Sequence, residues 1–220
     1  MTRAWSRTLA MVALVLVLAG AAVFATTRGL RTVSADGARR LDLARAPREL
    51  PALALLDQAG RQYAFGGPIA QGKSTDKSID KSELPVTLVT FVYTQCMAIC
   101  RTSASGQAWL QQQLRERRLQ DRVRLLTLSF DPARDTPAAL LAYARTLRAD
   151  PAIWIFATVA EPARLRGLLD AFGIVVLPDG LGGYSHNAAL FLVDAQGRLA
   201  AAYDVERPDL ALADVLRGRP

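Results

Sequence analysis

Hydrophobic and polar positions divide the chain into an apolar N-terminal segment and a longer region in which buried strands alternate with helices. Continuous β-branched and apolar runs predict strands buried on both faces at 86–92, 123–130 and 153–158. Helices are predicted after these strands, at 102–119, 137–148 and 161–172. This alternation predicts an α/β fold with a central β-sheet flanked by helices on both faces.

Shorter patterns surround this alternating region. The segments 50–56 and 62–65 flank a glycine turn and predict a pair of strands. A β-hairpin is predicted from 187–193 and 198–203, followed by a closing helix over 209–217. Thr136 followed by Pro137 is a typical helix start. The polar stretch 66–83 predicts a solvated loop.

The N-terminal segment is long and apolar enough to cross a membrane. Thr8 to Thr27 carries no charge and follows Arg3 and Arg7. Twenty helical residues span about 30 Å, the thickness of a bilayer's hydrocarbon core. We predict a transmembrane helix; the alternative is a signal peptide cleaved near Val23-Phe24-Ala25. The predicted organisation is therefore 1–27 anchor or signal peptide, 28–48 juxtamembrane linker and 49–220 globular domain.

Charge excludes one class of partner. The chain has 27 Lys and Arg against 20 Asp and Glu, and two of the arginines precede the apolar segment. The remainder is only mildly basic, and its arginines are scattered along helices instead of clustering with aromatic residues. This pattern is typical of solvated helix faces and predicts no nucleic-acid binding.

Metal and thiol chemistry must come from very few side chains. The chain has two cysteines, Cys96 and Cys100, and a single histidine, His186. These counts exclude a disulfide-dense scaffold, a four-cysteine zinc site and a multi-histidine metal centre. A Ser-His-Asp triad could use only His186 as its base.

The two cysteines are placed for reactivity. They are separated by three residues, where the strand 86–92 gives way to the helix 102–119. A helix N-terminus stabilises a thiolate and lowers the cysteine pKa. The alternative is a disulfide that only staples the loop in an oxidising compartment. Because a bridge closing so short a loop constrains the unfolded chain weakly, we favour a reactive pair.

His186 follows a glycine-rich stretch and is expected at the start of a strand. Taken alone, it is an ordinary surface or capping histidine. Two thiolates and one imidazole together form a soft ligand set suited to copper. A catalytic zinc site also matches these ligands, although no carboxylate base lies beside the motif. Met97 is interpreted as an apolar helix-start residue and not as a thioether ligand.

At this point the sequence resembles the Sco/SenC copper chaperones of cytochrome oxidase assembly. Four features in the same order carry the resemblance: the membrane segment, the run Phe91-Val92-Tyr93-Thr94-Gln95-Cys96-Met97-Ala98-Ile99-Cys100, the run Phe130-Asp131-Pro132-Ala133-Arg134-Asp135-Thr136-Pro137, and Tyr184-Ser185-His186 before the hairpin. The resemblance implies a thioredoxin-like fold, with copper held by Cys96, Cys100 and His186. It also implies delivery of copper to the CuA site of oxidase subunit II, or reduction of the receiving cysteines.

The cysteine loop departs from the family pattern. Met97 and Arg101 stand where family members usually have proline, and no acidic residue lies between the cysteines. A cationic Arg101 is expected to favour thiolates while repelling an incoming copper ion. Asp131 and Asp135 could dock a partner, but turn formation and helix capping explain them more economically.

The leading hypothesis is a membrane-tethered copper chaperone and not a turnover enzyme. Its expected partners are cytochrome c oxidase subunit II or another copper-receiving protein, together with a thiol-reducing protein. We expect a single-pass protein of the bacterial inner (cytoplasmic) membrane, with its soluble domain facing the periplasm or cell exterior. The alternative is an extracytoplasmic thiol–disulfide oxidoreductase that needs Cys96 and Cys100 but not His186. A thiol peroxidase and a purely structural anchored domain are further alternatives.

Overall fold

The computed structural model describes residues 2–26, 35–66, 85–96 and 99–218. The chain divides into two compact units, 1–42 and 43–220. The solvated loop predicted at 66–83 therefore lies, apart from Gly66, outside the described residues.

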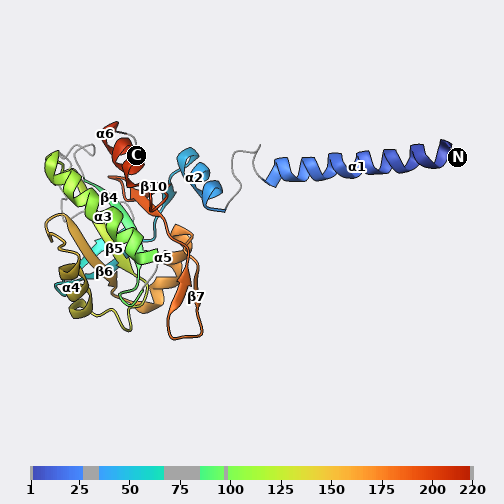
Figure 1. Cartoon of the computed structure of the whole chain (residues 1–220). Coiled ribbons are helices and arrows are strands. Elements are labelled where there is room, and N and C mark those ends of the chain that lie inside the picture. Colours follow the sequence, from blue (N-terminus) through green and yellow to red (C-terminus); the bar gives the residue numbers. More distant parts are fainter. Residues whose placement is uncertain (1, 27–34, 67–84, 97–98, 219–220) are drawn as a thin grey trace. The chain divides into compact units, whose positions relative to one another are not determined.

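The first unit contains the predicted membrane segment as one continuous helix, α1 (Thr2–Thr26), shown in Figure 1. Its stretch Arg7–Thr26 has 20 residues and a mean hydropathy of 2.6, enough by length and composition to cross a membrane. Its large apolar side chains are exposed all around the helix, the pattern expected of a helix that contacts lipid. A second helix, α2 (Ala35–Arg45), lies in the segment expected to be a linker.

The second unit is built on an eight-stranded sheet. Strands β4, β5 and β6 pair in parallel at its centre, and the other pairings are antiparallel. In spatial order the strands are β1 (Arg48–Glu49), β10 (Arg198–Tyr203), β9 (Leu190–Val193), β4 (Val86–Val92), β5 (Val123–Ser129), β6 (Trp154–Val159), β2 (Leu53–Asp57) and β3 (Gln62–Phe65). All the strands predicted from the pattern are present, with ends shifted by up to three residues.

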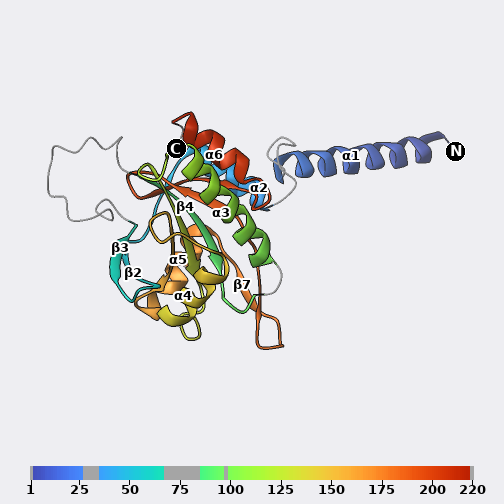
Figure 2. The ribbon, with the colours of Figure 1, turned by 60° about the vertical axis from the view of Figure 1, so that its left-hand side comes forward.

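Helices cover both faces of this sheet, as predicted (Figures 1 and 2). The helices are α3 (Ile99–Glu116), α4 (Pro137–Thr146), α5 (Leu165–Phe172), which follows a short 3-10 turn η2 (Pro162–Arg164), and α6 (Pro208–Leu216). One buried cluster joins α3, α4 and α6 to the sheet, and the other joins α5 to it. Side chains of β4 point alternately to the two faces of the sheet. Leu88 belongs to the cluster with α3, α4 and α6, whereas Val89 and Phe91 belong to the cluster with α5.

Local signals place α4 as expected. The hydroxyl of Thr136 accepts a hydrogen bond from the Ala139 amide at 3.3 Å, and Pro137 occupies the first turn. This cap satisfies one of the amide groups that every helix start leaves without an intrahelical partner. It also fixes the loop that runs from β5 into α4, which reaches the candidate site.

The expectation that His186 begins a strand was wrong. His186 is the last residue of β8 (Tyr184–His186), which pairs with β7 (Val176–Pro178) in a separate two-stranded ribbon. The next strand begins only at Leu190. Three-residue strands are too short to show an alternating pattern, which is why the ribbon escaped prediction.

Candidate metal centre

The cysteine pair lies at the junction of β4 and α3. After β4 ends, the chain turns, and the Cys96 amide donates to the Tyr93 carbonyl oxygen at 3.1 Å. Cys100 is in the first turn of α3, so the predicted strand-to-helix placement is confirmed. The two cysteines form a disulfide with their Cα atoms 5.9 Å apart. Cys100 is fully buried, whereas Cys96 is only partly buried.

A buried aspartate holds this turn in place. The carboxylate of Asp135 accepts hydrogen bonds from the Thr94 amide at 3.0 Å and the Thr94 hydroxyl at 2.6 Å. It also accepts one from the Ser129 hydroxyl. Asp135 is 1% exposed, and its side chain holds the turn before Cys96 from the protein interior. Sequence reasoning treated it as a turn or docking residue and missed this contact.

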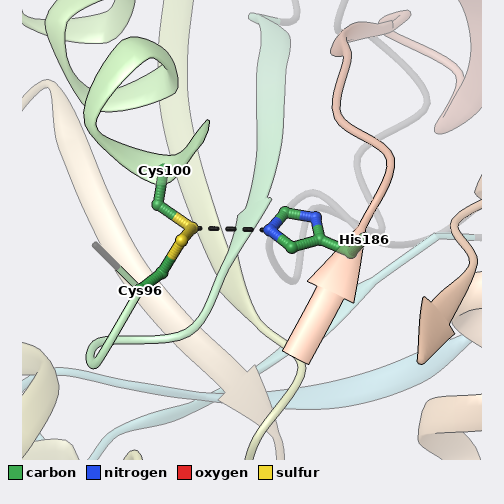
Figure 3. Close-up of side chains that lie close together, drawn as sticks. All are labelled: Cys96, Cys100 and His186. Atoms are coloured by element: carbon green, nitrogen blue, oxygen red, sulfur yellow. Dashed lines mark hydrogen bonds between the residues drawn. A yellow bond between two sulfur atoms is a disulfide. The ribbon is translucent and has the colours of Figure 1, made fainter. Parts of the chain in front are cut away.

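His186 faces the cysteine pair from the β7–β8 ribbon (Figure 3). Its Nε2 atom lies 3.5 Å from the Sγ atom of Cys100, and its Nδ1 atom lies 3.0 Å from the Asn187 carbonyl oxygen. A carbonyl oxygen only accepts, so Nδ1 carries the proton and Nε2 presents its lone pair to the sulfur. Burial lowers the pKa of His186 from its ordinary value of 6.5, and the hydrogen bond to Asn187 opposes this shift. The imidazole is therefore neutral at neutral pH.

An aromatic ring packs against the histidine and in turn contacts the ribbon. The Phe130 ring centroid lies 4.9 Å from that of His186 and 5.8 Å from that of Tyr184. The Tyr93 hydroxyl accepts a hydrogen bond from the Tyr184 amide at 3.2 Å, which ties the ribbon to the residue three before Cys96. The contact with Phe130 contributes to the burial that lowers the pKa of His186.

The three predicted ligands therefore come together. One ligand atom from each of Cys96, Cys100 and His186 lies within 4.8 Å of the other two. Two sulfurs and an imidazole nitrogen with an available lone pair are the donors that soft metal ions prefer. Arg101 is exposed in the first turn of α3. Met97 lies outside the described residues, so its interpretation stays a prediction.

Comparison with known proteins decides the family. The family model described as SCO1/SenC matches residues 62–219. The chain belongs to the SCO1/SenC family. The resemblance drawn from the sequence is thus confirmed, and the SCO1/SenC membership agrees with the thioredoxin-like fold of the second unit.

Individual SCO1/SenC relatives are distant. The SCO1 protein homolog of Bacillus subtilis (strain 168) is 26% identical over 129 residues, which cover 58% of this chain and 66% of that protein, just under two thirds. The solved structure of Bradyrhizobium japonicum ScoI with copper bound is 25% identical, with a TM-score of 0.57, covering 77% of this chain and 98% of that one. BsSco, described as having a disulfide switch and as a member of the Sco family of cytochrome c oxidase assembly proteins, is 20% identical, with a TM-score of 0.62, covering 79% and 94%.

Proposed function

We propose that this protein is a membrane-tethered copper carrier that binds one copper ion through Cys96, Cys100 and His186. The observation that carries the proposal is the convergence of these three ligand atoms within 4.8 Å. The neutral imidazole, with Nε2 turned toward Cys100, is ready to bind a metal without first losing a proton. The copper-bound structure of the ScoI relative supports the same cargo.

The redox state of the cysteines controls loading in this proposal. A thiol-reducing partner supplies two electrons and two protons, which convert the disulfide into two thiols. The thiols then lose their protons as they bind copper, because thiolate is the ligand form. The disulfide offers no thiolate and binds no copper in this way. The protein therefore carries copper only after reduction.

The proposed recipient is the CuA site of cytochrome c oxidase subunit II or another copper-receiving protein. The description of the relative BsSco as an oxidase assembly protein supports this assignment. The apolar helix α1 would tether the carrier to the bacterial inner membrane, with the second unit on the periplasmic or outer side. A membrane-bound recipient would then meet the carrier at the same surface.

A copper titration tests the proposal. The full chain in detergent is reduced and titrated with Cu(I) against a competing chelator. We expect about one copper per chain, as one set of two thiolates and one imidazole allows, and none on the disulfide form. Cys96→Ser, Cys100→Ser and His186→Ala should each weaken binding sharply. Met97→Leu should not, and a large affinity loss there would show that Met97 is a ligand. Unchanged affinity in His186→Ala would overturn the proposal.

The second candidate is a thiol–disulfide oxidoreductase. The pair of one partly exposed and one buried sulfur favours it, because such a bridge is open to attack from one side. Exchange with a small dithiol should need both cysteines but not His186. Normal exchange by His186→Ala, together with no copper retention in the wild type, would favour this function over copper transport.

A further inference from the structure

Arg134 occupies the loop between β5 and α4, and its guanidinium group contacts two other segments of the chain. Nε donates to the carboxylate of Asp131, which is 5% exposed. Nη1 donates to the Gly182 carbonyl oxygen at 2.6 Å and lies 3.4 Å from Oε1 of Gln95. A single side chain thus connects its own loop to two segments, 48 and 39 residues away.

Cation–π contacts with two tyrosine rings add to these hydrogen bonds. The guanidinium carbon of Arg134 lies 5.2 Å from the ring centroid of Tyr184 and 5.9 Å from that of Tyr93. Both distances are within the range of cation–π attraction. Tyr184 begins the strand that ends at His186, and Tyr93 begins the turn that ends at Cys96. Arg134 therefore touches the histidine-bearing ribbon and the cysteine turn together.

The ribbon needs external support to hold His186 in one place. Its two strands have three residues each and pair only with one another among the described residues. An isolated two-stranded ribbon is marginally stable in water. The hydrogen bond from Arg134 reaches the ribbon at Gly182, in the turn between its strands, while Asp131 fixes the direction of the guanidinium plane.

We propose that Arg134 is a positioning residue that sets the place of His186 relative to the cysteine pair. It does so without contacting a ligand atom. The expected effect of Arg134 on copper affinity rests on the proposed function, whereas its effect on the stability of the ribbon does not. Lysine cannot substitute, because a single ammonium lacks the planar fork of donors that serves Asp131 and Gly182 while the cation lies near the two rings.

The matched control is Arg198. Like Arg134, it is about one-third exposed, at 36% against 33% for the side chain, and it pairs with a buried aspartate, Asp194, in the turn that precedes β10. Arg198→Met therefore removes the same charge from the same kind of ion pair, but outside the site. Thermal unfolding is measured first for every variant, to check that each is folded before the copper affinities are compared.

The first measurement needs no copper. Hydrogen exchange of the ribbon amides, including Ser185 and His186, is followed by mass spectrometry on the full-length disulfide form in detergent. Arg134→Lys and Arg134→Met should speed exchange in the ribbon, whereas Arg198→Met should leave it unchanged. Unchanged ribbon exchange in both Arg134 variants would overturn the proposal.

The second measurement is Cu(I) affinity of the reduced full chain. Residues that orient a metal ligand typically contribute about 10-fold to 100-fold in affinity, so Arg134→Lys and Arg134→Met should lose affinity on that scale. In the His186→Ala background the same changes should cause no further loss, because the contact acts through His186. An equal loss in both backgrounds would overturn the positioning role. If the wild type binds no copper, the proposed function fails, and ribbon exchange still decides the role of Arg134.

Discussion

At the scale of single residues, the two cysteines differ in exposure. Cys100 is fully buried at the start of α3, whereas Cys96 is partly exposed in the preceding turn. Reagents reach a buried thiol only through local opening of the structure. We therefore expect an attacking thiolate to meet Cys96, with Cys100 as the leaving sulfur.

Alkylation of the reduced chain tests this difference in exposure between the two cysteines. Iodoacetamide should modify Cys96 faster than Cys100, on the order of tenfold or more because of the local opening that a buried thiol requires. Peptide mass spectrometry at short reaction times measures both sites. In guanidinium chloride, where burial is lost, the two rates should converge. Faster modification of Cys100 in the folded chain would contradict the assignment.

The sequence was sufficient to propose the ligands but not their supports. Cys96 and Cys100 could be placed because a buried strand and a helix meet at the motif, which is a local signal. His186 was chosen because one imidazole and two thiolates form a soft ligand set suited to copper, which the family resemblance also implied. The contacts of Asp135 and Arg134 span 41 and 48 residues. No local pattern encodes such distances, so only the folded chain shows these roles.

At the scale of elements, a buried polar network fastens α3 to the sheet. The Thr127 hydroxyl donates to Oε1 of Gln107 and accepts from Nε1 of Trp154 at 2.8 Å. Nε2 of Gln107 donates to the carbonyl oxygens of Leu88 and Leu126. Gln107 therefore joins α3, whose first turn contains Cys100, to two central strands.

Gln107→Ala should lower the free energy of unfolding by about 2 kcal/mol, because it leaves the buried Thr127 hydroxyl without its acceptor. Denaturant unfolding of the detergent-solubilised chain, followed by tryptophan fluorescence, measures the change. The control is Gln112→Ala in the same helix, where the side chain is exposed and bonds Glu116. Similar losses in the two variants would contradict a specific role for the network.

A second contact of α3 makes stability depend on pH. Arg115 donates to Asp150 at 2.7 Å, and this bond, with help from the Ala152 amide, lowers the pKa of Asp150 below its ordinary value of 3.8. The unfolded chain therefore takes up this proton at higher pH than the folded chain. The contribution is complete above pH 3.8 and is lost as pH falls through the folded pKa.

Asp150→Asn should remove this pH dependence. Thermal unfolding of both proteins is compared from about pH 6 to about pH 2, and the advantage of the wild type should shrink by about 0.5 kcal/mol, the usual scale of a solvent-screened pair. Asp170→Asn is the control, because its pair with Arg166 is more exposed on both sides. A constant difference between the wild type and Asp150→Asn over this range would contradict the expectation.

Strand length decided which elements could be predicted. β4 and β5 are buried along nearly their whole length and produce seven-residue strands rich in apolar residues. β7 and β8 have three residues each and show no period.

The helix α2 was missed because its sequence is rich in arginine and alanine, with a single buried residue described, Leu43. Such a helix has no apolar stripe for a pattern to detect.

At the scale of the whole molecule, alternation predicted two covered faces but not the order of strands. The pair β2–β3 joins the sheet beside β6, and the hairpin β9–β10 joins it beside β4. Hydrophobic pattern reports which face a residue occupies, whereas neighbouring strands are chosen by long-range pairing. The place of the hairpin brings the two halves of the candidate site together. Strand β9 begins soon after His186, and it pairs with β4, whose end leads to Cys96.

The second unit carries the site, so the role of α1 can be tested separately. Its apolar stretch of 20 residues, with a mean hydropathy of 2.6, is long enough for a bilayer of about 30 Å. We expect the full chain to stay with membranes during an alkaline carbonate wash and to keep the mass of its uncleaved N-terminus. The double variant Val15→Arg and Leu16→Arg should be released, because each arginine at a helix centre costs about 2.5–3.5 kcal/mol of insertion. A shortened chain, cleaved near Ala25 and recovered free of membranes, would contradict the anchor and show that the segment is a signal peptide.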